Sequence, residues 1–540
     1  MGTTIFKEEI DNEMSSATVS QEAVTATHQA IEVPAKQSEL NSAVTVVLSV
    51  LTILLTLRYI VWRVSVNSWH LWWLSLPLLA AELFTAMHIL GYQYTIWPRT
   101  APALSPTQDP SSLPIFMFIP TVNEGDDVLG KTISGALATR DNLLTHYPNA
   151  KVRVIVCNDG FVANVTNWQS VESLASSLGA ECVTRRVHGG AKAGNIEHAR
   201  QLVGATGDSL LVVLDADQVA EPEFLIRTIQ HFADPEIGWV QTRQFYRNCD
   251  SRVSRWAENQ ATLFYDLVCP GKSTINASYI CGTNVVIRAK VLDQIGGFPT
   301  ESVTEDFAAS IRTHQLWRSI YIKDALAKGL GPMDLTGYFV QQSRWSRGTI
   351  GVLRSDWKLL FLPQKNGLTA AQRIQYFLSG THYLCGLRDL VFLSTALVSL
   401  YLSRSPIVPV SIPTIAYYLL PYILASQALI LIQSKSPSAI TGMVIGYISF
   451  PTLVWSTVEA LVNKKMRFKV TPKSASMQSD LQAVIPQVAI ALLCVVVIIH
   501  ALINKEELTK TNIIPMFWVT YAFCLLIPTF VLAKLRPTSK

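Results

Sequence analysis

Long apolar runs near the start of the chain predict membrane-spanning helices. The run at 43–62 is long enough to cross a hydrocarbon core of ~30 Å as a helix. A second run, at about 69–92, is of similar length and carries Glu82 near its middle, where a charged side chain is costly in lipid and is expected to face other helices. Residues 1–42 hold seven acidic and two basic residues without apolar periodicity, so they are predicted to form a disordered tail.

Between residues 99 and 359 the pattern changes to that of a soluble α/β domain, in which short β-rich apolar runs alternate with polar turns and helical stretches. Open parallel sheets bind ligands outside the carboxyl ends of their strands. We therefore expect the site where acidic or amide residues follow strands. The four expected strands are 115–120, 152–157, 209–215 and 239–242, and the first three are followed or ended by Asn123 and Glu124, by Asn158 and Asp159, and by Asp215 and Asp217.

The last third of the chain returns to membrane character. The run at 438–462 is interrupted by glycines and a proline and leads into a segment rich in Lys and Arg, which favours the cytoplasmic side, so we interpret it as interfacial or re-entrant. Six spans are then expected, two before the α/β domain and four after it. The predicted regions are a tail (1–42), two transmembrane helices (43–98), a cytoplasmic domain (99–359), and interfacial helices with four transmembrane helices near 386–402, 413–433, 483–503 and 513–533 (360–540).

Composition supports the membrane assignment and argues against some classes of partner and site. The chain of 540 residues is 49% hydrophobic and 15% charged, too little polar surface for an ordinary soluble protein of this length. The net charge of +5 comes without a basic cluster interleaved with aromatics, so nucleic acid is not an expected partner. The eight cysteines form no C-x-x-C pair, which indicates neither a disulfide framework nor a zinc site and favours a reducing compartment for the soluble part.

Three motifs point to chemistry on a sugar nucleotide. Asp215 and Asp217 follow a strand, where they could hold a divalent cation that neutralises a leaving pyrophosphate, although two such residues often only cap a turn. Asp306, in the TED motif, could accept the proton of an attacking hydroxyl, although acidic residues also favour the start of a helix for electrostatic reasons. The segment QQSRWSRG (341–348) offers guanidinium groups for phosphate and an indole for a sugar ring, or marks an amphipathic helix at the membrane surface.

Eight short motifs follow one another along the chain. They are VNEGDD (122–127), VCNDG (156–160), AKAGN (191–195), DAD (215–217), ICGTN (280–284), TED (304–306), Q-x-x-R-W (341–345) and FKVTPK (468–473). In this order they resemble the motifs of the processive family 2 glycosyltransferases. The resemblance is greatest to the catalytic subunits of bacterial cellulose synthases, and curdlan and mixed-linkage β-glucan synthases are also similar. It covers about residues 43–535 and implies an α/β glycosyltransferase domain of the GT-A type, with a mixed, mostly parallel sheet, inserted between α-helical transmembrane segments.

The resemblance also implies a role for each matching residue. Asp306 matches the general base of an inverting displacement that gives β linkages. Asp217, together with Asp215, matches the binding site of Mg²⁺ or Mn²⁺. Donor-binding residues are Glu124, Asp159, Lys192, Asp215, Gln341, Arg344 and, in a gating loop at 464–476, Phe468, Val470 and Thr471, while Cys281, Gly282 and Trp345 match acceptor-binding positions.

The function implied is that of a hexosyltransferase that polymerises a cellulose-like β-glucan from UDP-glucose and translocates it. Its partners would be a UDP-sugar, the growing polysaccharide and the lipid bilayer of the cell membrane, with accessory export subunits or further copies of the chain left open. Gln218 and Gln244 stand where histidines are usual, Val122 stands where an aromatic often packs, and no cyclic di-GMP-binding domain is recognised, so the product and its regulation stay open. The alternatives are a synthase of curdlan or another β-glycan, a non-processive enzyme that glycosylates a lipid, and a transporter or scaffold with a degenerate domain.

Overall fold

The computed structural model describes residues 35–365, 367–434, 438–462, 480–504 and 513–533. It divides into two compact units, 1–48 and 49–540. The first contributes to this description only the beginning of helix α3 (Ala35–Ser65), and most of the predicted tail lies outside the described residues. The α/β domain and the helices after α3 belong to the second unit.

The centre of the α/β domain is a seven-stranded sheet in the order β3-β2-β1-β4-β7-β6-β8. Strand β7 runs antiparallel to both of its neighbours, and the other neighbouring strands are parallel. A small ladder, β5 with β9, lies beside it. The strands are β1 (Ile115–Thr121), β2 (Val152–Asn158), β3 (Glu181–Thr184), β4 (Leu210–Val213), β5 (Val219–Ala220), β6 (Ile237–Thr242), β7 (Val285–Arg288), β8 (Arg318–Ile322) and β9 (Ala327–Lys328).

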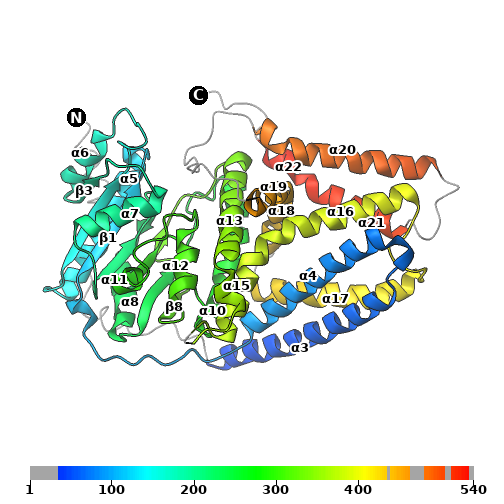
Figure 1. Ribbon diagram of the computed structural model, residues 1–540, viewed down its shortest axis with the longest axis horizontal. Helices are drawn as coiled ribbons and strands as arrows, with labels where there is room; N and C mark the ends of the chain where they lie inside the picture. The colour runs from blue at the N-terminus through cyan, green and yellow to red at the C-terminus, as the bar shows by residue number, and fades with distance from the viewer. Residues whose placement is uncertain (1–34, 366, 435–437, 463–479, 505–512, 534–540) are drawn as a thin grey trace. The chain divides into compact units, whose positions relative to one another are not determined.

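Helices cover both faces of this sheet (Figure 1), so its strands are apolar on both sides. In β1, Met117 packs in a core with residues of α5 and α8, whereas the next residue, Phe118, packs in a second core with residues of α7 and α11. The mixed, mostly parallel sheet confirms the predicted fold class. The helices of the domain are α5 (Asp126–His146), α6 (Gln169–Leu178), α7 (Ala191–Leu202), α8 (Phe224–Ile229), α9 (Arg252–Leu263), α10 (Cys269–Ser273), α11 (Ala289–Asp293), α12 (Glu305–Thr313), α13 (Leu335–Ser355) and α14 (Trp357–Phe361).

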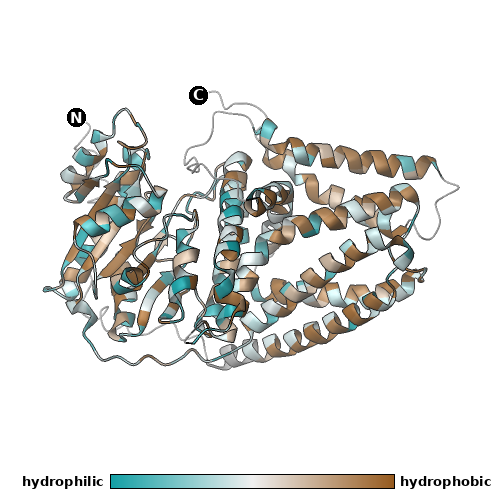
Figure 2. Ribbon diagram, in the orientation of Figure 1, coloured by the Kyte–Doolittle hydropathy of each residue, from teal (hydrophilic) through white to brown (hydrophobic). Residues whose placement is uncertain are grey.

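Six helical stretches of the described chain are long and apolar enough to cross a membrane, and Figure 2 shows hydrophobic residues along them. They are Ser42–Ser65, Trp69–Ile96, Ala370–Leu402, Ile412–Ser434, Leu481–Ile503 and Ile513–Leu532. Their helices are α3, α4 (Trp72–Ile96), α15 (Ala370–Thr381) with α16 (Cys385–Leu402), α17 (Ile412–Ser434), α20 (Leu481–Ile503), and α21 (Ile513–Leu526) with α22 (Pro528–Leu532). The carboxylate of Glu82 on α4 forms an ion pair with Arg63, whose Nε lies 2.6 Å away.

The segment interpreted as interfacial forms two helices, α18 (Ala439–Ile448) and α19 (Phe450–Leu461), bent by 54° at their junction. The pair could count as a seventh span by composition. Both helices pack on the α/β domain. A Cβ on Gly442 would lie 2.6 Å from the backbone nitrogen of Gln260 on α9, and Arg347 on α13 forms a 2.7 Å ion pair with Glu459 on α19. The domain and the apolar helices therefore share a packed boundary.

Candidate active site

The carboxyl ends of three neighbouring strands form the edge at which the site is built. Strands β2, β1 and β4 are parallel and adjacent, so the residues that follow them meet at this edge. The backbone N–H of Asp159, after β2, donates to the carbonyl of Thr121 at the end of β1 over 2.9 Å. Asp215 and Asp217 follow β4. The structure thus brings these residues together at one edge, where the sequence pattern predicted the site.

Glu124 shapes the loop after β1. Its Oε2 accepts hydrogen bonds from Thr121 Oγ1 at 2.7 Å and from the N–H of Val122 at 2.8 Å. This carboxylate therefore satisfies backbone donors of its own loop. Its predicted contact with the donor stays a prediction.

Asp159 is buried in a two-pronged ion pair that sequence reasoning missed. Arg185, directly after β3, donates from Nε to Oδ1 at 2.8 Å and from Nη2 to Oδ2 at 2.6 Å. Such a fork fixes the carboxylate in one orientation. Both residues lie where β2 and β3 end side by side, and their contact depends on this pairing, which the sequence pattern did not predict.

Lys192 links the DAD motif to the loop that carries Gly282. It stands in the first turn of α7, and its Nζ lies 2.5 Å from Asp215 Oδ1 and donates to the carbonyl of Gly282 at 2.6 Å. Burial acts to lower the pKa of this amine, but the carboxylates of Asp215, Glu305 and Asp306 outweigh it and raise the pKa above its ordinary value. The ammonium group is therefore charged at neutral pH.

Asp306 lies against the glycine that Lys192 holds. A Cβ built on Gly282 would be 2.8 Å from Asp306 Oδ2 and 3.8 Å from Lys192 Nζ. Burial and the neighbouring charge of Glu305 raise the pKa of Asp306 to about 7, while the N–H of Phe307 and the charges of Lys192 and Arg344 oppose this rise. A carboxylate in this pKa range is suited to accept a proton near neutral pH.

The loop that carries Gly282 is held by side-chain amides that sequence reasoning did not identify. Gln241 accepts from the N–H of Cys281 at 2.7 Å and donates to the carbonyl of Thr283 at 2.9 Å. Gln244, one of the departures from the expected histidines, donates to the carbonyl of Cys281 at 2.8 Å. Gln241 lies in β6, which is buried along its whole length, and Gln244 lies in the segment after it.

Gln218, the second departure, continues this network. Its Oε1 accepts a 3.0 Å hydrogen bond from Asn284, which occupies a left-handed backbone conformation at φ 54°. Thr283 Oγ1 accepts from the N–H of Asp215 at 2.9 Å. The acceptor-side loop and the DAD motif are thus tied to each other directly.

Helix α13 brings the Q-x-x-R-W residues to the same place. Gly348 on this helix packs directly against Thr304, the residue before Glu305. The charge of Arg344 acts on both acidic residues of the TED motif, lowering their pKa values against the effect of burial. Trp345 is half-buried one position further along the helix.

Gln341, one turn before Arg344, contacts Tyr246, and this tyrosine lies near the DAD motif. Its Nε2 donates to Tyr246 Oη at 3.2 Å. Burial raises the pKa of Tyr246, and the charge of Asp217 raises it further. The structure therefore gathers Lys192, Asp215, Asp217, Gly282, Asp306, Gln341 and Arg344 around one site.

Asp215 and Asp217 fit a divalent cation whose remaining ligands the sugar-nucleotide donor would supply. Asp217 is buried, and its Oδ2 accepts from the N–H of Leu330 at 2.9 Å. In the described part of the chain, no three His, Cys, Asp or Glu side chains gather closely enough to hold a metal by themselves. Mg²⁺ is commonly bound by one or two carboxylates, waters and substrate phosphates, which is the donor set that Asp215 and Asp217 offer.

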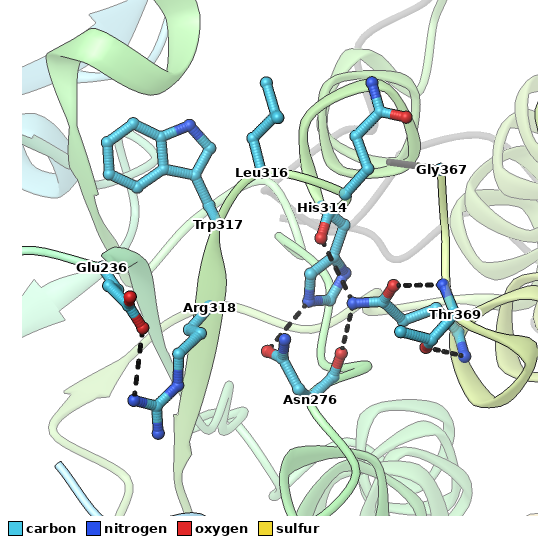
Figure 3. A pocket seen from close by; sticks show the side chains of 10 residues that line it. Glu236, Asn276, His314, Leu316, Trp317, Arg318, Gly367 and Thr369 are labelled. Carbon is cyan, nitrogen blue, oxygen red and sulfur yellow. Dashed lines mark hydrogen bonds and ion pairs between the residues drawn. The ribbon is translucent and has the colours of Figure 1, made fainter. Parts of the chain in front are cut away.

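One predicted feature falls outside the description of the site, and one cavity lies away from the site. The proposed gating loop, with Phe468, Val470 and Thr471, falls outside the described residues. A polar cavity of about 220 Å³, lined by His314 and Arg318 among others (Figure 3), lies where β8 begins, at the opposite edge of the sheet from the carboxylates.

Comparison with known proteins finds similarity over much of the chain. Residues 117–296 match the family model "Glycosyl transferase family 2", and 210–433 match "Glycosyl transferase family group 2". Cellulose synthase 2 of Novacetimonas hansenii is 30% identical over 477 residues, which are 85% of this chain and 29% of that protein. The cellulose synthase 1 catalytic subunit [UDP-forming] of Komagataeibacter xylinus is 29% identical over 475 residues, 83% of this chain and 60% of that protein.

These values confirm the resemblance predicted from the motifs. The chain nevertheless spans less than two thirds of the length of these relatives. Among solved structures, the mannosyltransferase PcManGT from Pyrobaculum calidifontis in complex with GDP-Man and Mn²⁺ aligns with a TM-score of 0.47 and 20% identity, over 73% of this chain and 100% of that one.

Proposed function

We propose that this chain, which carries a family 2 glycosyltransferase domain between apolar helices, is a processive inverting hexosyltransferase of the cell membrane. It polymerises a cellulose-like β-glucan from UDP-glucose and passes the product across the bilayer. The observation that carries the proposal is the meeting of Asp306, Lys192 and Asp215 around the backbone of Gly282. Similarity to cellulose synthases over most of the chain supports it.

Asp306 is the general base. Its ionised carboxylate accepts the proton of the acceptor hydroxyl as that oxygen attacks the anomeric carbon, from the face opposite the leaving diphosphate. An α-linked donor thereby gives a β linkage. The backbone of Gly282 leaves room for the acceptor beside the base, because a side chain there would contact the carboxylate.

The cationic groups of the site receive the leaving diphosphate. Lys192 on α7 lies 2.5 Å from Asp215, Gln341 on α13 donates to Tyr246, and the charge of Arg344 on α13 acts on Asp306. A divalent cation held by the two aspartates would supply Lewis-acid stabilisation of the diphosphate charge. Placing positive charge where negative charge develops is commonly the largest catalytic contribution.

The acceptor chain lies between the loop of Cys281 and the indole of Trp345. Contact with Cys269 and burial raise the pKa of the Cys281 thiol, so it stays neutral and offers an uncharged wall. Helix α13 packs on the apolar helix pair through Arg347 and Glu459, so the acceptor site adjoins the membrane helices. The α/β domain faces the cytoplasm, where UDP-glucose is made.

The test is incorporation of labelled UDP-glucose by the purified full-length chain with Mg²⁺. A high-molecular-weight product on a size-exclusion column is expected, and linkage analysis should report β-glucose. Asp306→Asn keeps the shape of the base but cannot accept the proton, so incorporation should fall at least ~100-fold. Asp324→Asn, at an exposed ion pair, is the control. Products of one or a few sugars would reject processivity, and full activity of Asp306→Asn would reject the base.

A further inference from the structure

A second cavity lies at the boundary between the membrane helices and the α/β domain. It measures about 450 Å³ and is walled by α4, α14 and α15. Leu90 and Tyr94 line it from α4, Phe361 lines it from α14, and Ile374 lines it from α15. This volume is in the range of ligand pockets, ~300–1,000 Å³, and the lining is almost entirely apolar.

The floor of the cavity is a tight contact between two candidate membrane spans. A Cβ on Gly91 of α4 would lie 2.5 Å from Cδ1 of Leu378 on α15, so these helices touch there. Both residues also line the cavity. These helices belong to the candidate spans Trp69–Ile96 and Ala370–Leu402.

Three basic residues, called the rim cations, lie on the wall of the cavity or close to residues that line it. Among the described residues that line it, Arg373 is the one with a charge, and it is anchored by hydrogen bonds to the carbonyls of Leu368 and Leu360. Arg99 stacks over the ring of Tyr94 at 4.6 Å. Lys358 is exposed on α14, a helix whose Trp357 and Phe361 are also exposed. Aromatic and basic residues together are typical of the level of lipid headgroups.

We propose that this cavity binds one anionic phospholipid of the leaflet on the side of the α/β domain. An acyl chain fills the space between α4 and α15, and the phosphate is held by the rim cations. An apolar space filled by an acyl chain and a negative headgroup facing basic residues together match the chemistry of the lining. A zwitterionic lipid would satisfy the apolar part but leave the cations without a net negative partner.

The lipid would also support the helix of the candidate base. Leu360 lines the cavity and belongs to a buried cluster with Phe307 and Tyr376. Tyr376 lies two residues after the exposed Ile374, on the other face of α15, and its ring meets that of Phe307 edge-on at 5.5 Å. Phe307 follows Asp306 on α12. This coupling to synthesis rests on the proposed function, whereas lipid binding itself does not.

The binding test uses the purified full-length chain in nanodiscs made of equal parts phosphatidylglycerol and phosphatidylcholine. After transfer to detergent, native mass spectrometry counts the retained lipids. Ile374→Trp fills the cavity and should lower retained phosphatidylglycerol several-fold. Ile499→Trp, on the lipid-facing side of α20 with a similar exposed fraction, is the matched control and should retain as much as the unaltered chain. Equal retention in the two variants overturns the proposal.

A second experiment reverses one charge at the rim. Its result does not depend on filling the cavity. Lys358→Glu should shift retention from phosphatidylglycerol toward phosphatidylcholine, and Lys131→Glu, an exposed lysine on α5, should not. An unchanged preference for phosphatidylglycerol in Lys358→Glu overturns the assignment of an anionic headgroup. Incorporation of labelled sugar is then compared in discs of either lipid alone. A chain that makes no polymer in any disc refutes the proposed function, and the lipid counts still decide the site.

Discussion

Adding a single methyl group at Gly282 tests the placement of the base. Its Cβ would stand 2.8 Å from Asp306 Oδ2, closer than carbon and oxygen normally approach, so the carboxylate must move by several tenths of an ångström. The backbone at Gly282 has φ 83°, which costs a residue with a side chain ~1–2 kcal/mol. Because misplacing reacting groups by ~1 Å can cost ~100-fold in rate, we expect Gly282→Ala to lower kcat by ~10- to 100-fold.

Gly296 provides a control with the same backbone cost. Its φ is 79°, and an added Cβ would meet no heavy atom within 4 Å. Gly282→Ala and Gly296→Ala should therefore lower the melting temperature similarly, whereas only the first should slow synthesis. The assay is the initial rate of radiolabelled glucose incorporation, measured beside thermal unfolding of each variant. Equal losses of rate in the two variants would refute the reasoning that Gly282 positions Asp306.

Three further predictions follow from charges in and around the site. Because the pKa of Asp306 is about 7 and only its ionised form accepts a proton, synthesis should fall as pH drops through about 7, and Glu305→Gln should move this fall to lower pH in a pH–rate profile. Arg347→Ala leaves the largely buried Glu459 without its ion-pair partner. The free energy of unfolding should fall by on the order of 3 kcal/mol, which a lower melting temperature would show. Arg227→Ala, at an exposed pair, should cost at most ~1 kcal/mol. EDTA should stop incorporation and Mg²⁺ or Mn²⁺ should restore it, and activity unaffected by EDTA would contradict the metal role of the DAD motif.

The edge of the sheet that carries the site was predictable because its signals are local. An apolar run such as 115–121 is buried on both faces, so it shows a continuous pattern that identifies a strand. Asp159, Asp215 and Asp217 follow such runs directly. The rule that parallel strands end together then places these residues at one edge, without knowledge of the strand order.

The partners of those residues were not predictable, since they depend on strand order and on loops far apart in sequence. Arg185 meets Asp159 because β3 pairs with β2, and Gln241 meets the loop of Cys281 because β6 lies beside β7. A similar limit applies to the third candidate span. Hydropathy indicated a helix from about 386, whereas the helical stretch begins at Ala370.

The earlier half of that stretch was hidden by its polar residues. Gln372 donates to the carbonyl of Asn276 at 2.8 Å, and Gln375 donates to Thr95 Oγ1 at 2.8 Å. Both glutamines are buried against other elements, so their polarity reflects contacts within the protein and not exposure to water. Hydropathy alone cannot distinguish these two reasons for a polar residue in a helix.

The bent pair α18–α19 restricts how the enzyme can work. Gly442 leaves no gap to α9, and Ser456 on α19 donates to Ser346 on α13 at 3.0 Å, two positions from Arg344. Residues of α9, α13, α18 and α20 share one apolar cluster. Under the proposed function, a catalytic domain held by these contacts would keep its place against α18 and α19 while the product advances. Each forward step would then come from rearrangements smaller than a helix, among the side chains that touch the newly added sugar.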